Sequence, residues 1–101
     1  MTERGTGRTK AMVERLPAEG GHIVIHTWAL RLYVEQMILS LRGPDVAKRT
    51  RVHVIRYRGD EVKILGAYGH IEIDHAWHSA VSVDLGLTID RMVDQVKATC
   101  P

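Results

Sequence analysis

The sequence contains the stretch His22-Ile23-Val24-Ile25-His26-Thr27, followed directly by a segment from Trp28 to Leu41 with apolar residues at helical spacing. The first stretch is β-branched, of strand length, and preceded by the break Gly20-Gly21, which predicts a strand. The second ends at Gly43-Pro44, a typical helix stop. A strand followed by a helix of about fifteen residues suits a parallel connection, so this pair predicts an α/β fold.

The rest of the chain repeats this alternation. A helix of about two turns, capped by Thr9 and ended by Pro17, precedes the first strand, and further strands are predicted at residues 51–57 and 70–74. A closing helix is expected over residues 88–98, while residues 61–65 and 77–87 carry no decisive pattern. The predicted fold class is therefore α/β, with a small, mainly parallel sheet of three to four strands and about three helices.

Polar and apolar residues alternate in two of the predicted strands. His22 and His26 alternate with isoleucines in the first, and His70, Glu72 and Asp74 do so in the third. Such alternation indicates a sheet with one half-exposed face. We therefore expect a sheet covered well on one side and poorly on the other, the poor side being available for self-association.

Length and composition favour one small domain over residues 1–101, with residues 1–8 expected to be flexible or ordered by a ligand. The net charge of +2 is too slight to indicate a nucleic-acid-binding protein. Basic residues nevertheless cluster locally, which leaves a weak polyanion contact open, although a strand edge guarded by charge is favoured. They are Lys48, Arg49, Arg51, Arg56 and Arg58.

The single cysteine, Cys100, has no partner for an intramolecular disulfide, which indicates a reducing compartment. The sequence has no apolar run of about eighteen residues and no secretory signal pattern. We therefore expect a cytoplasmic protein that makes no contact with a membrane.

A glycine-rich segment, Gly5-Thr6-Gly7-Arg8-Thr9-Lys10, runs into the first predicted helix. Glycines let consecutive backbone N–H groups converge on a phosphate, and the start of a helix adds unpaired amides and the positive end of its dipole. A threonine hydroxyl at this point is able to bind a metal ion. The segment therefore predicts a phosphate-binding loop.

Together with residues 65–76, Leu-Gly-Ala-Tyr-Gly-His-Ile-Glu-Ile-Asp-His-Ala, this loop resembles the core of P-loop NTPases. The loop corresponds to the end of the Walker A motif and the strand ending at Asp74 to Walker B. The chain is similar in particular to small P-loop-like proteins encoded by bacteriophages, in which a G-x-G-R-T loop starts the chain and a strand ending Asp-His-Ala closes the core. The resemblance spans residues 5–76 and implies a minimal P-loop-like core.

The resemblance implies that a nucleotide, with ATP as the first candidate, binds at residues 5–10. It implies that Thr9 and Asp74 hold its Mg²⁺, through a hydroxyl and through water. Arg8 stands where the family has lysine, Thr2 where it has an earlier glycine, and no strand precedes the loop. We therefore expect binding with weak or no hydrolysis. His75 is the one candidate to orient a water, and no catalytic residue is assigned.

Two other functions stay open. The first is a non-enzymatic phage-type interaction protein that contacts a host protein or a second copy through an exposed sheet face. The second is a metal-dependent hydrolase, in which a row formed by His22 and His26 faces the His70, Glu72 and Asp74 row around a divalent ion. The histidine spacing matches no standard zinc signature, so polar residues on a half-exposed face are the preferred interpretation.

Overall fold

The computed structural model describes residues 7–99. Its three strands form one sheet in the order β2-β1-β3, and both neighbouring pairs are parallel. The predicted α/β fold with a small parallel sheet is thus confirmed. In chain order, the elements are α1 (Arg8–Glu14), β1 (His22–Ile25), α2 (Trp28–Arg49), β2 (Arg51–Val54), the 3-10 helix η1 (Asp60–Ile64), β3 (Ile71–Ile73), α3 (Trp77–Ala80) and α4 (Val83–Thr99).

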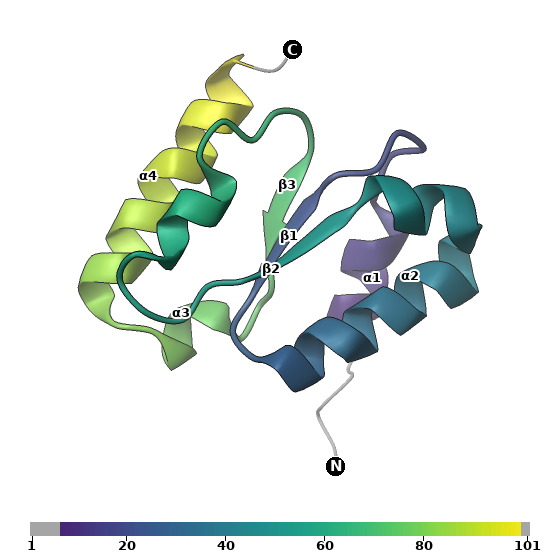
Figure 1. The fold of residues 1–101 in the computed structure, drawn as a ribbon, viewed down its shortest axis with the longest axis horizontal. Coiled ribbons are helices and arrows are strands. Elements are labelled where there is room, and N and C mark those ends of the chain that lie inside the picture. Colours follow the sequence, from purple (N-terminus) through teal and green to yellow (C-terminus); the bar gives the residue numbers. More distant parts are fainter. Residues whose placement is uncertain (1–6, 100–101) are drawn as a thin grey trace.

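Helices lie on both faces of the sheet (Figure 1), with α1 and α2 on one side and α3 and α4 on the other. Alternate residues of β1 serve the two layers. Ile23 and Ile25 pack with the α1 and α2 side, whereas Val24 packs with the side formed by η1, α3 and α4. The sheet is therefore the middle of three layers.

The expectation of a half-exposed sheet face is wrong. Ile23, Val24 and Ile25 are all fully buried, and Leu85, Ile89 and Val93 of α4 cover the second face. Three of the polar residues that produced the alternation have side-chain partners: His22 hydrogen-bonds His53 of β2, and Glu72 binds His70 and also Arg15. These contacts let the three residues lie in a covered sheet.

Helix α2 confirms the strongest helical pattern of the sequence and extends it. Thr27 caps its start by accepting a hydrogen bond from the Leu30 amide at 3.0 Å. Gly43 interrupts the helical backbone with φ 90° and ψ 171°, and the helix resumes from Pro44. The predicted stop at Gly43-Pro44 is therefore a break between two helical segments.

Helix α1 departs from the prediction at its start. Gly7, with φ 97°, is the cap residue, and no side chain caps the helix. Thr9 lies within the first turn, on the face that also carries Met12 and Val13, and all three are buried. The predicted cap, Thr9, is thus a buried residue that faces the interior of the protein.

The remaining boundaries follow from local hydrogen bonds. The unassigned segment at residues 61–65 forms most of η1, with Ile64 buried. Helix α4 begins five residues earlier than expected, where Ser82 Oγ accepts from the Leu85 amide at 3.2 Å. Within residues 7–99, no helix is long and apolar enough to span a membrane.

Candidate functional site

The strand order places the carboxyl ends of β1 and β3 side by side. From β1 the chain passes through α2 on one face of the sheet to reach β2, whereas the connection from β2 to β3 carries η1 on the opposite face. In open parallel sheets, ligands bind at the carboxyl ends of the strands where the connections diverge in this way. The fold therefore points to the ends of β1 and β3.

A pocket of about 460 Å³ lies at this position, a volume that fits a small ligand. Its walls come from four parts of the chain: α1, the end of β1, the first turns of α2, and the end of β3. The lining residues are Thr9, His26, Thr27, Ala29, Leu30, Tyr33, Asp74, His75 and Ala76.

Asp74 is the buried acidic residue of this pocket and is only 2% exposed. Its backbone amide extends the β3 ladder by donating to Val24 O at 2.9 Å, and its Oδ2 accepts from the Ala76 amide at 3.2 Å. Its Oδ1 has no hydrogen-bond partner among the described residues, although His75 Nδ1 lies 3.5 Å away, within ion-pair distance. Backbone bonds thus fix a carboxylate that keeps one oxygen free.

His26 provides the second unsatisfied polar atom. Its Nδ1 is buried and has no partner in the described part of the chain. His26 Nδ1 and Asp74 Oδ1 are the two buried side-chain atoms without a partner in residues 7–99, and both residues line this one pocket. Because buried polar atoms are nearly always paired in folded proteins, their presence together indicates a place where a ligand or water binds.

The start of α2 adds backbone donors to the same wall. The Leu30 amide is satisfied by Thr27 Oγ1, and the Arg31 amide donates to Thr27 O at 3.0 Å. The remaining amides of this first turn belong to Trp28 and Ala29, and Ala29 lines the pocket. The positive end of the α2 dipole therefore lies beside the pocket.

Of the predicted phosphate loop, the structure describes Gly7 to Lys10, and one of these residues lines the pocket. Gly5 and Thr6 lie outside the described residues, and Gly7 caps α1. Arg8 and Lys10 are exposed, neither of them lines the pocket, and Lys10 borders a separate hollow with Tyr33 and Met37 of α2. Among Gly7 to Lys10, the residue that lines the pocket is Thr9. It shares the pocket with Asp74, the residue predicted as its partner in metal binding.

The predicted histidine rows are not found. His22 Nδ1 lies 3.0 Å from His53 Nε2, and the two rings stack with centroids 5.3 Å apart. His70 Nε2 hydrogen-bonds Glu72 at 2.7 Å. No group of three or more His, Cys, Asp or Glu side chains within residues 7–99 is arranged to hold a metal ion by itself.

Burial explains the electrostatics of the His22–His53 pair. It lowers the pKa of His53 to about 4, with further contributions from the charges of His22, Arg31, Arg51 and Lys63. Burial followed by the charge of Arg51 lowers the pKa of His22 as well. Both rings are therefore neutral at pH 7, and one donates to the other.

Glu72 differs because its partners are cationic or able to donate. Burial would raise the pKa of Glu72, but hydrogen bonds and charge from Arg15 and His70 outweigh it and lower the pKa. The same contact raises the pKa of Arg15. These strand residues form closed polar contacts that need no ligand.

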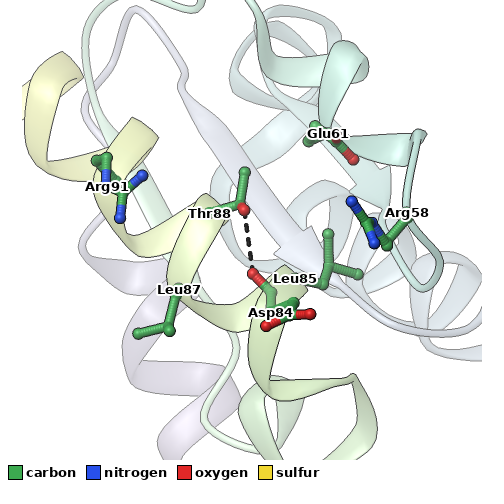
Figure 2. Close-up of a pocket in the computed structure, with 7 residues that line it drawn as sticks. All are labelled: Arg58, Glu61, Asp84, Leu85, Leu87, Thr88 and Arg91. Atoms are coloured by element: carbon green, nitrogen blue, oxygen red, sulfur yellow. Dashed lines mark hydrogen bonds between the residues drawn. The ribbon is translucent and has the colours of Figure 1, made fainter.

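A second hollow, of about 280 Å³, lies between α4 and the segment that contains η1 (Figure 2). Arg58 and Glu61 border it on one side, and Asp84 and Arg91 of α4 on the other. Arg58, Asp84 and Arg91 are exposed, so water solvates their charges, and the two positive charges are balanced by two negative ones. This hollow holds no buried unpartnered atom, which makes it the weaker candidate.

Comparison of the chain with family models, curated proteins and solved structures found no match. The resemblance to P-loop proteins, including those of bacteriophages, stays a prediction, as does the cytoplasmic location. The proposed function therefore rests on the geometry of the pocket at the ends of β1 and β3.

Proposed function

We propose that the protein binds a small phosphate-bearing ligand, a nucleotide, together with Mg²⁺ in the pocket at the carboxyl ends of β1 and β3. The observation that carries the proposal is the buried Oδ1 of Asp74, which accepts no hydrogen bond from any residue in the range 7–99. A carboxylate oxygen held in this way, beside the start of a helix, suits a cation that is itself shared with an anionic ligand.

The phosphate has donors on the α2 side of the pocket. The amide of Ala29 and the positive end of α2 are suited to an anion, and His26 adds a ring nitrogen, Nδ1, that has no partner in residues 7–99. The apolar part of the wall, formed by Ala29, Leu30 and Tyr33, is suited to a base or another flat apolar group. Binding in this direction places the phosphates nearest Asp74.

The charge of the pocket explains why the proposal includes a metal ion. Among the described residues, the lining includes one carboxylate and neither Lys nor Arg, so a bare phosphate would be repelled by Asp74. Mg²⁺ keeps several waters and is commonly held by one or two carboxylates plus substrate phosphates, and when bound it neutralises this repulsion. Asp74, through water, and the hydroxyl of Thr9 are the residues that would hold it, which fits a pocket without a three-residue metal cluster.

The proposal is for binding with weak or no turnover. His75 is exposed, and its Nδ1 lies within ion-pair distance of Asp74 Oδ1. A ring in that place is able to orient a water, but no Lys or Arg within residues 7–99 lines the pocket to stabilise charge on a transferring phosphoryl group. Its residues are therefore better suited to retention of a nucleotide than to its hydrolysis.

Calorimetric titration with ATP, ADP and GTP tests the proposal, each with Mg²⁺ and with EDTA. We expect heat of binding for at least one nucleotide with Mg²⁺ and at least a tenfold loss of affinity without it. Asp74→Asn preserves the shape and the acceptor for the Ala76 amide, and Asp94→Asn is the matched control, since Asp94 is exposed on α4. Absence of binding, or binding that Asp74→Asn leaves unchanged, would contradict the proposal.

An interaction through a bare sheet face is not favoured, because helices cover both faces of the sheet. A metal-dependent hydrolase built on histidines also lacks a supporting observation in residues 7–99. Strand β2 forms one edge of the sheet, which helices on the two faces do not pair with.

A further inference from the structure

Strand β2 is an edge strand whose outer backbone groups pair with no other strand in the described part of the chain. The Arg51 amide donates to Gly21 O and the Ile55 amide to Ile25 O, both at 2.9 Å, so the odd-numbered residues of β2 face β1. Alternation along a parallel strand then directs the N–H and C=O groups of Val52 and Val54 outward. Lys63 Nζ confirms this direction, since it donates to Val54 O at 2.7 Å from outside the sheet.

A groove of about 550 Å³ runs along this edge. We call it the β2 groove. One wall is α2 and the other is η1, and the residues of β2 form the floor. The lining residues are Trp28, Arg31, Glu35, Thr50, Arg51, Val52, His53, Val54 and Lys63. At about 3.3 Å per residue, the four residues of β2 offer roughly 13 Å of edge to an added strand.

The charge of the β2 groove is positive. Arg31, Arg51 and Lys63 line it against a single acidic residue, Glu35. Arg31 is bound to Glu35 at 3.0 Å, and Lys63 lies 3.8 Å from Asp60 beside the groove. Arg51 is exposed and forms no ion pair with another described residue. The unneutralised positive charge thus lies directly on the edge strand.

This charge decides between possible occupants. A second copy that paired through β2 would bring Arg51 and Lys63 of both copies together, and like charges across a strand pair are destabilising. An extended acidic peptide neutralises these charges and satisfies the outward groups of Val52 and Val54 at the same time. A nucleic acid would neutralise the charges but has no extended peptide backbone to match the spacing of the strand.

We propose that an extended acidic peptide segment of a partner protein adds to β2 as a fourth strand, with its carboxylates on the η1 side, facing Arg51 and Lys63. The mode is strand addition at a sheet edge, in which backbone hydrogen bonds provide affinity and side chains provide specificity. Lys63 leaves Val54 O as the peptide arrives and turns to an acidic side chain. Of the basic residues that cluster around β2 in the sequence, Arg51 lines the groove and then has a function in recognition.

The test uses a synthetic hexapeptide of alternating Glu and Val, capped at both ends, and follows the amide NMR signals of the full chain. We expect shifts at Val52 and Val54 and slower hydrogen exchange of their amides. A peptide of the same sequence that is N-methylated at every residue keeps the charge but loses its backbone donors whichever way the strand runs, so it should bind at least tenfold more weakly. A Lys-Val hexapeptide should not bind.

Arg51→Glu reverses the charge at the edge, and Arg91→Glu on α4 is the matched control. We expect Arg51→Glu to weaken binding of the acidic hexapeptide at least tenfold and Arg91→Glu to leave it unchanged. Equal binding of the N-methylated peptide would overturn strand addition. So would shifts confined to other surfaces, preference for oligo-dT over the peptide, or a dimer of the free protein that protects Val52 and Val54.

Discussion

Two sets of polar residues in the sheet region differ in how they are satisfied. Within the strands, His22 pairs with His53, and Glu72 with Arg15 and His70. Directly after the strands, His26 and Asp74 each keep a buried atom without a partner in residues 7–99. Since an unpaired buried polar atom costs stability, the first set stabilises the fold, and the second is better explained by a ligand. The comparison separates structural from functional polar residues by their hydrogen bonds.

The largest predicted contrast comes from neutralising one carboxylate in each set. Asp74→Asn should weaken binding of the Mg²⁺–nucleotide complex about thirtyfold, or about 2 kcal/mol. The same change should leave the melting temperature of the ligand-free protein unchanged or raise it, because it neutralises a buried carboxylate whose Oδ1 has no hydrogen-bond partner in residues 7–99. Calorimetry and thermal unfolding measure the two effects. A lowered melting temperature with unchanged binding would place Asp74 in the structural set.

Glu72→Gln should behave in the opposite way. It removes the charge that Arg15 and His70 bind, so we expect the melting temperature to fall by roughly 5 °C. Nucleotide binding should remain unchanged, since Glu72 does not line the pocket. Loss of nucleotide affinity in this variant, measured at a temperature where it is folded, would contradict the division between structural and ligand-binding polar residues.

The His22–His53 pair predicts a dependence of stability on pH. Burial depresses the pKa of both rings, so the unfolded chain binds more protons than the folded one below about 6.5. Stability should therefore fall as pH decreases from 6.5 towards the pKa of His53 near 4.

His53→Gln should flatten this part of the pH profile, and His78→Gln, at an exposed histidine, should not. Thermal unfolding in steps of half a pH unit measures it. Glu72 contributes only in the lower part of the range, since its pKa lies below the ordinary 4.5. If the slope of stability against pH is unchanged in His53→Gln, the His22–His53 pair does not cause the loss of stability at low pH.

The smallest expected effect is at Thr9. Thr9→Val keeps the buried shape of the side chain in α1 and removes the hydroxyl that faces the pocket. We expect about threefold weaker binding of the Mg²⁺–nucleotide complex, or about 0.7 kcal/mol, with little change in melting temperature. Calorimetry with Thr50→Val as a buried control elsewhere measures it, and equal losses in both variants would show that Thr9 makes no specific contact.

The periodic elements were predictable because one local pattern decided each of them. The pattern from Trp28 gave the first part of α2, and the β-branched run gave β1. The start of α4 was missed because its cap is the hydrogen bond from the Leu85 amide to Ser82, and Gly86 within it is atypical of a helix interior. The second face of the sheet was predicted to be half-exposed because the first turns of α4 were not predicted. Leu85 and Ile89 of α4 cover that face.

The site was predictable in part. The sequence singled out Thr9 and Asp74, and both line one pocket. The contribution of Thr27 and of the first turn of α2 to the site was not predicted. It depends on strand order, which brings the ends of β1 and β3 together. His26 was paired with His22 by alternation, but the approach of His53 from β2 separates their roles. Contacts between strands distant in sequence cannot be predicted from the spacing within one strand.

An amide NMR titration of the full chain with Mg²⁺–ATP tests nucleotide binding most directly, because it locates the ligand without any substitution. We expect the largest shifts at Asp74, Ala76 and the first turn of α2, around Trp28 and Ala29, with no comparable change at Glu72 or His53. Shifts centred on Arg58 and Arg91, the hollow of Figure 2, would contradict the proposal, as would a titration without any shift.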